Sequence, residues 1–148
     1  MNKCSGVKIG NETVSILMYA DDVALIAEKE GDLQDMLNVM HKWCETWNIV
    51  VNADKSQIVH YRKKNATQTM VDFKISNKTL IKVDRYKYLG LVLEYSLDYS
   101  VTASVIAKSA SRALGLLISK AKCMGGLSYN CFSKLYESCV VPIIRYGA

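Results

Sequence analysis

Three apolar runs separated by polar residues near the start of the chain predict three short strands. Apolar runs at 7–9 and 14–19 flank Gly10-Asn11, a typical turn dipeptide. A further apolar run, 23–27, follows after only a few residues. The chain must therefore turn tightly at Asp21-Asp22, two adjacent carboxylates inside an otherwise apolar stretch. Aspartate accommodates such turns because its carboxylate accepts local backbone N–H bonds.

Residues 30–48 carry the clearest helical pattern. Their apolar side chains recur at spacings of three and four: Leu33, Met36, Leu37, Met40, Trp43, Cys44 and Trp47. Asp32 suits the N-cap of this helix. Further strands are expected on both sides of 52–56, in a hairpin through 76–78, and over 88–93, where Gly90 permits a bend.

From Val101 onward the pattern becomes helical. One helix is expected to run to about Met124, before Gly125-Gly126, and a second from about Ser128 toward Pro142. No run reaches the length expected of a membrane-spanning helix, and the start of the chain lacks a secretory signal. The predicted fold class is α+β: an antiparallel sheet with one packed helix, followed by two helices.

The charge of the chain is unevenly distributed. The net charge is +5, but the first 54 residues have a net charge of −5 and the remainder +10. An acidic region that could hold cations therefore precedes a basic region that could hold an anionic polymer. Ordinary solvated surface charge is the alternative interpretation.

The cysteines do not form a recognisable framework. They are odd in number and contain no C-x-x-C pair: Cys4, Cys44, Cys123, Cys131 and Cys139. Their spacing fits neither a zinc site nor a set of disulfides. Reduced and mostly buried thiols in an intracellular protein, in the nucleus or cytoplasm, are the expectation.

The adjacent carboxylates of Asp21 and Asp22 need a favourable environment, because burying an unpaired carboxylate costs several kcal/mol. Three environments would serve: solvent at a hairpin tip, a Lys or Arg partner, or a metal ion. Magnesium binds few carboxylates together with waters and phosphate oxygens, at roughly 2.0–2.1 Å. A plain solvated turn and a metal site both remain open on this pattern.

Tyr19-Ala20-Asp21-Asp22 between apolar strands resembles the catalytic hairpin of reverse transcriptases. The resemblance continues in order with "NADKSQIV" (52–59), similar to the next palm segment, and "YKYLGLVLE" (86–94), similar to a hairpin that supports the primer end. "VVPIIRYGA" (140–148) looks like the start of the thumb and connection region. The sequences of these segments are most similar to those of non-LTR, LINE-type polymerases of the jockey-like group.

The resemblance implies a role for each matching residue. Asp21 would be a catalytic metal ligand and Asp22 its supporting acidic neighbour. Lys55 would approach the nucleotide triphosphate, although a solvated turn lysine is the alternative. The residues lining the nucleotide and primer would be Tyr19, Ala20, Tyr88, Leu89 and Gly90, with a core tyrosine as the alternative for Tyr88. Basic side chains that could contact the nucleic-acid backbone are Arg62, Lys63, Lys64, Lys108 and Arg112.

The implied parent activity is RNA-directed DNA synthesis by nucleotidyl transfer with two Mg²⁺ (or Mn²⁺) ions. Its partners would be an RNA template, a DNA primer and dNTPs, with no membrane. Residues 1–97 would form part of a palm, and 98–148 the start of the thumb or connection helices. The family also implies an earlier metal-binding aspartate and a fingers region, neither of which precedes Val14. We therefore expect the chain alone to be inactive and to need the upstream part of the polymerase as a partner.

Two other functions fit the same residues. A non-enzymatic relic or domesticated fragment would bind nucleic acid through its basic half, and a generic cation-binding domain would use Asp21 and Asp22 without nucleic acid. We also expect the isolated chain to aggregate, because a palm sheet without its neighbouring strands leaves an open edge.

Overall fold

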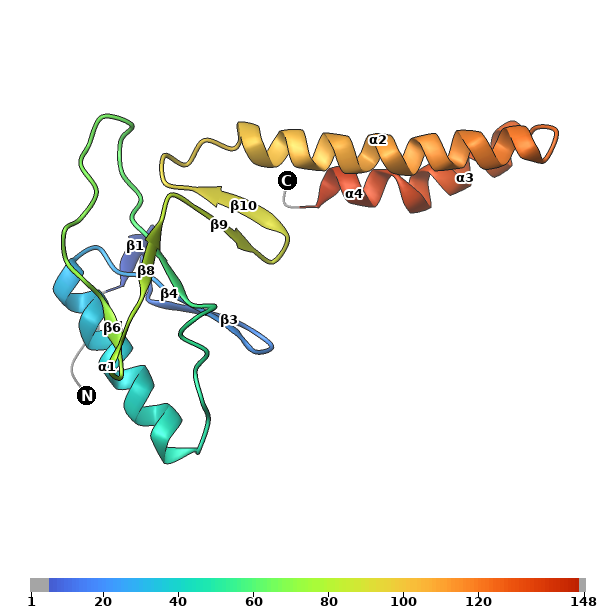
Figure 1. The fold of residues 1–148 in the computed structure, drawn as a ribbon. Helices are drawn as coiled ribbons and strands as arrows, with labels where there is room; N and C mark the ends of the chain where they lie inside the picture. The colour runs from blue at the N-terminus through green and yellow to red at the C-terminus, as the bar shows by residue number, and fades with distance from the viewer. Residues whose placement is uncertain (1–5, 147–148) are drawn as a thin grey trace. The chain divides into compact units, whose positions relative to one another are not determined.

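The computed structural model describes residues 6–146, which divide into two compact units (Figure 1). The first contains the residues up to His60 together with Asn65–Val83, and the second contains Tyr61–Lys64 together with the chain from Asp84 onward. Helices and short sheets make up the protein, so the predicted α+β class is confirmed. The boundary between palm and thumb regions near residue 97 remains a prediction.

Two antiparallel hairpins open the first unit. Strand β1 (Val7–Ile9) pairs with β2 (Glu12–Val14), and β3 (Ile16–Tyr19) pairs with β4 (Asp22–Leu25). The apolar pattern predicts three strands here, and the strand expected over 14–19 is divided into β2 and β3. The turn lies one residue earlier than expected, at Ala20-Asp21, so Asp22 is already the first residue of β4.

Helix α1 (Glu30–Thr46) follows the hairpins and buries Met36, Leu37 and Cys44. It begins earlier than predicted, with Lys29 at the N-cap, so the assignment of Asp32 to the N-cap is wrong. Asp32 lies instead in the first turn, where its charge interacts favourably with the helix dipole.

The rest of the first unit contributes β5 (Gln57–Val59), β6 (Lys74–Ile75), β7 (Lys78–Thr79) and β8 (Ile81–Val83). The predicted hairpin through 76–78 is confirmed as β6–β7. The predicted strand before Asn52 is wrong, and β5 pairs with β8 in parallel, so the expected single antiparallel sheet is replaced by separate two-stranded ladders. These elements surround a core of Leu37, Ile58, Phe73, Ile75 and Leu80.

The second unit begins with an antiparallel hairpin, β9 (Arg85–Tyr88) and β10 (Leu91–Glu94). The strand predicted over 88–93 is thus two strands. Leu89 and Gly90 form the turn between them with φ of +47° and +86°. Positive φ at both loop residues is the signature of the tight turns that match the twist of paired strands.

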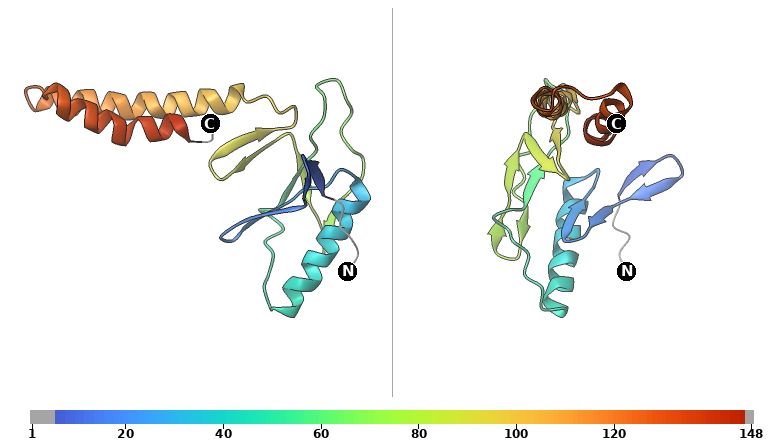
Figure 2. Two further views of the ribbon diagram at one scale, coloured as in Figure 1. Left: turned by 180° about the vertical axis from the view of Figure 1, so that it is seen from behind. Right: turned by 90° about the vertical axis from the view of Figure 1, so that its right-hand side faces the viewer.

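Three helices complete the second unit: α2 (Ser100–Cys123), α3 (Tyr129–Cys139) and α4 (Val141–Arg145). In both views α3 and α4 run back along α2 (Figures 1 and 2). Ser128 caps α3 by accepting the N–H of Cys131, as the predicted start requires. The second predicted helix is divided at Val140, because Pro142 lacks an N–H and occupies the first turn of α4.

Helix α2 corrects the expectation that no segment is long and apolar enough to span a membrane. It has 24 residues and is apolar enough to cross a membrane by length and composition, and little of its apolar stretch is buried. This criterion is also met by core helices and signal sequences, so it carries little weight by itself.

Candidate active site

The tip of the β3–β4 hairpin brings four of the predicted site residues together. Tyr19 and Asp22 are directly paired across the two strands, and Ala20 and Asp21 form the connecting turn. All four are exposed. Ala20 has a φ of +52°, a conformation that usually selects glycine, so the backbone at this tip is held in an unfavourable geometry.

The two faces of the hairpin differ in character. Side chains alternate along a strand, and directly opposed residues share a face. Ile16 and Met18 therefore lie on one face with Val23 and Leu25, and these four line a groove against α1. Asp22 lies on the opposite face beside Tyr19 and is exposed there. The hairpin thus turns one apolar face toward the helix, and the opposite face carries Asp22 and Tyr19 near the tip with Leu17 and Ala24 behind them.

The paired carboxylates fit part of a divalent metal site. Magnesium accepts one or two protein carboxylates and completes its six positions with water and phosphate oxygens. Asp21 and Asp22 provide such oxygens from a short, rigid turn. Among residues 6–146, no group of three or more His, Cys, Asp or Glu side chains is arranged to hold a metal ion. The described residues therefore supply two of the ligands of such a site and no more.

Lys55 lies in the same unit, in a turn organised by Asn52. The Asn52 side-chain oxygen accepts the N–H groups of Asp54 and Lys55 at 3.2 and 3.3 Å, and the Ser56 hydroxyl donates to its carbonyl at 2.9 Å. This network fixes the backbone and leaves Lys55 exposed.

The predicted primer-supporting residues Tyr88, Leu89 and Gly90 lie in the second unit, at the β9–β10 turn. Tyr146, which follows α4, donates its hydroxyl to the Leu89 carbonyl. A Cβ added to Gly90 would lie 3.3 Å from Cε1 of Tyr146, so glycine allows the ring to lie against the turn. Sequence reasoning missed this role of Tyr146, because no local pattern links it to residues 57 positions earlier.

The basic residues fall into two groups. Most of those in the middle of the chain are paired within the protein. Arg62 lies 2.8 Å from Asp84 and is 12% exposed, Lys64 lies 3.4 Å from Asp98, and Lys82 lies 3.1 Å from Asp72. The guanidinium of Arg62 is thus engaged by protein groups, and its contact with a nucleic-acid backbone remains a prediction.

Three other predicted backbone-contacting residues present their side chains to solvent: Lys63, Lys108 and Arg112. Lys108 and Arg112 lie one turn apart on α2, and side chains at this spacing are neighbours on a helix surface. The helix therefore presents two neighbouring positive charges to solvent at this point.

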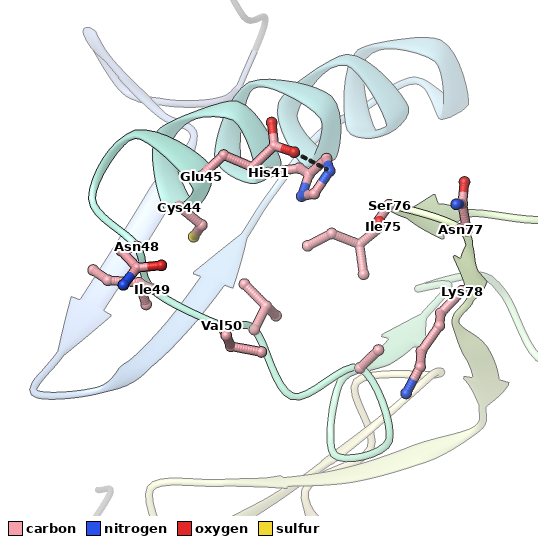
Figure 3. Close-up of a pocket in the computed structure, with 12 residues that line it drawn as sticks. His41, Cys44, Glu45, Asn48, Ile49, Val50, Ile75, Ser76, Asn77 and Lys78 are labelled. Carbon is pink, nitrogen blue, oxygen red and sulfur yellow. Dashed lines mark ion pairs between the residues drawn. The ribbon is translucent and has the colours of Figure 1, made fainter.

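A cavity of about 490 Å³ lies within the first unit, between the end of α1, residues 48–53 and the β6–β7 turn (Figure 3). None of the predicted site residues lines it. Its charged groups are already engaged, His41 with Glu45 at 3.4 Å and Lys78 with Asp54 at 3.6 Å. We interpret it as a gap in packing, and place the candidate site at the hairpin tip.

Comparisons with known proteins identify the family to which the chain belongs. Residues 2–93, more than half of the chain, match the family described as reverse transcriptase (RNA-dependent DNA polymerase). The chain is 27% identical over 150 residues to the RNA-directed DNA polymerase from mobile element jockey of Drosophila melanogaster, and 28% identical over 152 residues to that of Drosophila funebris. It is 24% identical over 135 residues to a probable RNA-directed DNA polymerase from transposon BS of Drosophila melanogaster.

These alignments cover 95%, 99% and 87% of the chain, but only 16%, 16% and 15% of the relatives. The chain thus spans about a sixth of the length of the curated relatives it matches. No solved structure matches it significantly. The resemblance to jockey-like, non-LTR polymerases is confirmed, and the chain belongs to the reverse transcriptase family.

Proposed function

We propose that this chain forms part of the active centre of an RNA-directed DNA polymerase of a non-LTR retrotransposon. The observation that carries the proposal is the exposed Asp21-Asp22 pair at the two-residue tip of β3–β4, within the residues that match the family. Adjacent carboxylates on a rigid hairpin form a preorganised cation site. The polymerase would use an RNA template, a DNA primer and dNTPs.

The metal would be Mg²⁺ or Mn²⁺, held by Asp21 with support from Asp22. When bound, it would lower the cost of ionising a primer 3′-hydroxyl and offset negative charge on the nucleotide phosphates. The contribution of the chain itself is to hold two acidic oxygens at a fixed turn. With two ligands, we expect weak metal binding.

The other residues would position substrate. Tyr19 and Ala20 would lie beneath the primer terminus or nucleotide, and the exposed ammonium of Lys55 would approach the triphosphate. The β9–β10 turn, with Tyr88, Leu89 and Gly90, would support the primer strand. Lys108 and Arg112 would contact the phosphate backbone without reading sequence.

We further propose that the 148 residues do not polymerise alone and that the rest of the polymerase is their partner. A third carboxylate ligand is not arranged near Asp21 and Asp22 within the described residues. The thiols of Cys44, Cys123, Cys131 and Cys139 are free, and all but Cys44 are exposed, so the expectation that the cysteines are mostly buried is wrong for the described residues. Exposed thiols persist in a reducing compartment, so we place the protein inside the cell, in the nucleus or cytoplasm.

Manganese binding tests the metal site directly. Paramagnetic broadening by Mn²⁺ in the purified chain should centre on residues 19–22 and be lost in Asp21→Asn. Asp35→Asn is the matched control, because Asp35 is an exposed carboxylate on α1 outside the hairpin. Equal broadening in both variants would reject Asp21 as a ligand.

Primer extension tests the reaction. In a jockey polymerase chimera carrying this chain in place of the aligned segment, Asp21→Asn should abolish RNA-templated extension and Asp35→Asn should not. Extension that survives Asp21→Asn would overturn the proposed function, and extension by the isolated chain would overturn its predicted inactivity.

A further inference from the structure

The face of β3–β4 that is turned toward α1 is only partly covered. A groove of about 410 Å³ lies there, wholly within the first unit. Apart from Ser15, its walls are apolar; Ile16, Met18, Val23 and Leu25 come from the hairpin, and α1 adds Val39 and Trp43 among others.

Large apolar side chains remain in water along this groove. Met18 is 64% exposed, Val39 56%, Trp43 50% and Ile16 47%. Single exposed apolar residues are ordinary, but a continuous set that lines one groove marks an interaction surface. The groove adjoins the core of this unit through Leu25, but Ile16, Met18, Val39 and Trp43 are not part of the core cluster around Phe73 and Leu80.

The position of the groove restricts what can occupy it. It lies over the face of the hairpin, between the sheet and a helix. A segment placed there cannot join the ladder, because strand hydrogen bonds run along sheet edges and not from the face. It must therefore satisfy its own backbone N–H and C=O groups, and a helix does this within one segment.

We propose that an amphipathic helix from the polymerase region outside the matched segment docks in this groove beside α1. The inference rests on the proposed function. The matching relatives are about six times longer than the chain, so most of a polymerase of that kind lies outside these residues. The helix would lie roughly 8–10 Å from the axis of α1 and insert apolar side chains at positions i, i+3 or i+4, and i+7.

Co-expression tests this assignment. The 148-residue chain would be produced with the part of the Drosophila melanogaster jockey polymerase that precedes the aligned segment, and the two purified through a tag on one. We expect a 1:1 complex. Val39→Glu, which places a charge in the groove wall, should reduce the recovered partner at least tenfold, and Trp43→Ala should reduce it as well. Met70→Glu is the control, because Met70 is 86% exposed and lies outside the groove.

The outcomes separate three interpretations. Loss of the complex in Val39→Glu with retention in Met70→Glu supports the inference. No complex with the unaltered chain, or one that survives Val39→Glu, overturns it. A homodimer that Val39→Glu dissociates assigns the groove to a second copy and also overturns it. A complex that depends on Val39 but extends no primer retains the docking site and rejects the polymerase function.

Discussion

The guanidinium of Arg62 lies over the ring of Tyr95, with its central carbon 4.1 Å from the ring centroid. The same side chain bonds Asp84 at 2.8 Å, and its backbone N–H donates to the Tyr95 carbonyl at 2.8 Å. Residues 61–64 are thereby held within the second unit by stacking, an ion pair and a backbone hydrogen bond. Arg62 begins a basic run, but its side chain is engaged by protein groups.

Arg62→Ala should lower the free energy of unfolding by about 1–2 kcal/mol, because it removes both the stacking and the ion pair. Arg62→Lys should recover only part of this, since an ammonium lacks the planar fork of a guanidinium. Urea denaturation measures the effect. Lys63→Ala is the control and should stay within about 0.5 kcal/mol; an equal loss in Lys63→Ala would contradict the assignment.

Local pattern predicted the hairpin tip, and long-range contacts account for most of what it missed. Strand alternation around Asp21-Asp22 is contained in a dozen residues, so the turn could be anticipated to within one position. Arg62 and Lys63 are neighbouring basic residues that the sequence does not distinguish. Only the fold shows that Asp84 and Tyr95 contact Arg62. The parallel β5–β8 pairing joins strands over twenty residues apart and has no local signal either.

Replacing Gly90, the glycine of the β9–β10 turn, should destabilise the protein. Gly90→Ala would place a side chain at φ +86° and a Cβ 3.3 Å from the Tyr146 ring. We expect a loss of about 1–3 kcal/mol, from backbone strain with some relief as the ring shifts. Gly115→Ala in α2 provides the opposite control. A Cβ added to Gly115 would meet no atom within 4 Å apart from the backbone of its own helix, so the free energy of unfolding should rise by about 0.5–1 kcal/mol. Thermal unfolding of the two variants should therefore move in opposite directions.

Ala20 should be a site where glycine stabilises. An alanine at a φ of +52° carries about 1–2 kcal/mol of backbone strain, which a glycine would relieve. Glycine also loses more conformational entropy on folding, and this reduces the gain by about 0.4–1 kcal/mol. A net gain of about 0.5–1 kcal/mol is expected for Ala20→Gly. Ala24→Gly in β4 should instead destabilise by a similar amount, because its backbone is already extended. Denaturant midpoints that fall in both variants would show that the turn is not strained.

Acid should weaken the start of α2 through Asp98. The Ser100 backbone N–H donates to this carboxylate at 3.0 Å, and this bond, the Ser100 side chain and Lys64 lower the pKa of Asp98 below its ordinary 3.8. A lowered pKa in the folded state means that the stabilisation is present above pH 3.8 and is lost as the pH falls through the folded pKa. Asp98→Asn should therefore lose less stability than the unaltered chain between pH 5 and pH 2, measured by thermal unfolding. Parallel curves would contradict the linkage.

The salt dependence of nucleic-acid affinity should distinguish side chains that contact phosphates from Arg62, which is paired within the protein. If Lys108 and Arg112 each neutralise a phosphate, replacing either by alanine should reduce the slope of log affinity against log salt by about 0.7–0.9. Arg62→Ala should leave that slope unchanged, because its guanidinium is already paired with Asp84. Fluorescence anisotropy with an RNA–DNA hybrid measures all three. Asp21→Asn should bind the hybrid at least as tightly as the unaltered chain does, since its carboxylate repels phosphate unless a metal intervenes. Binding that survives Asp21→Asn, together with a chimera that extends no primer even with Asp21 in place, would favour the non-enzymatic nucleic-acid-binding function. A slope unaffected by Lys108→Ala and Arg112→Ala would remove α2 from the interface.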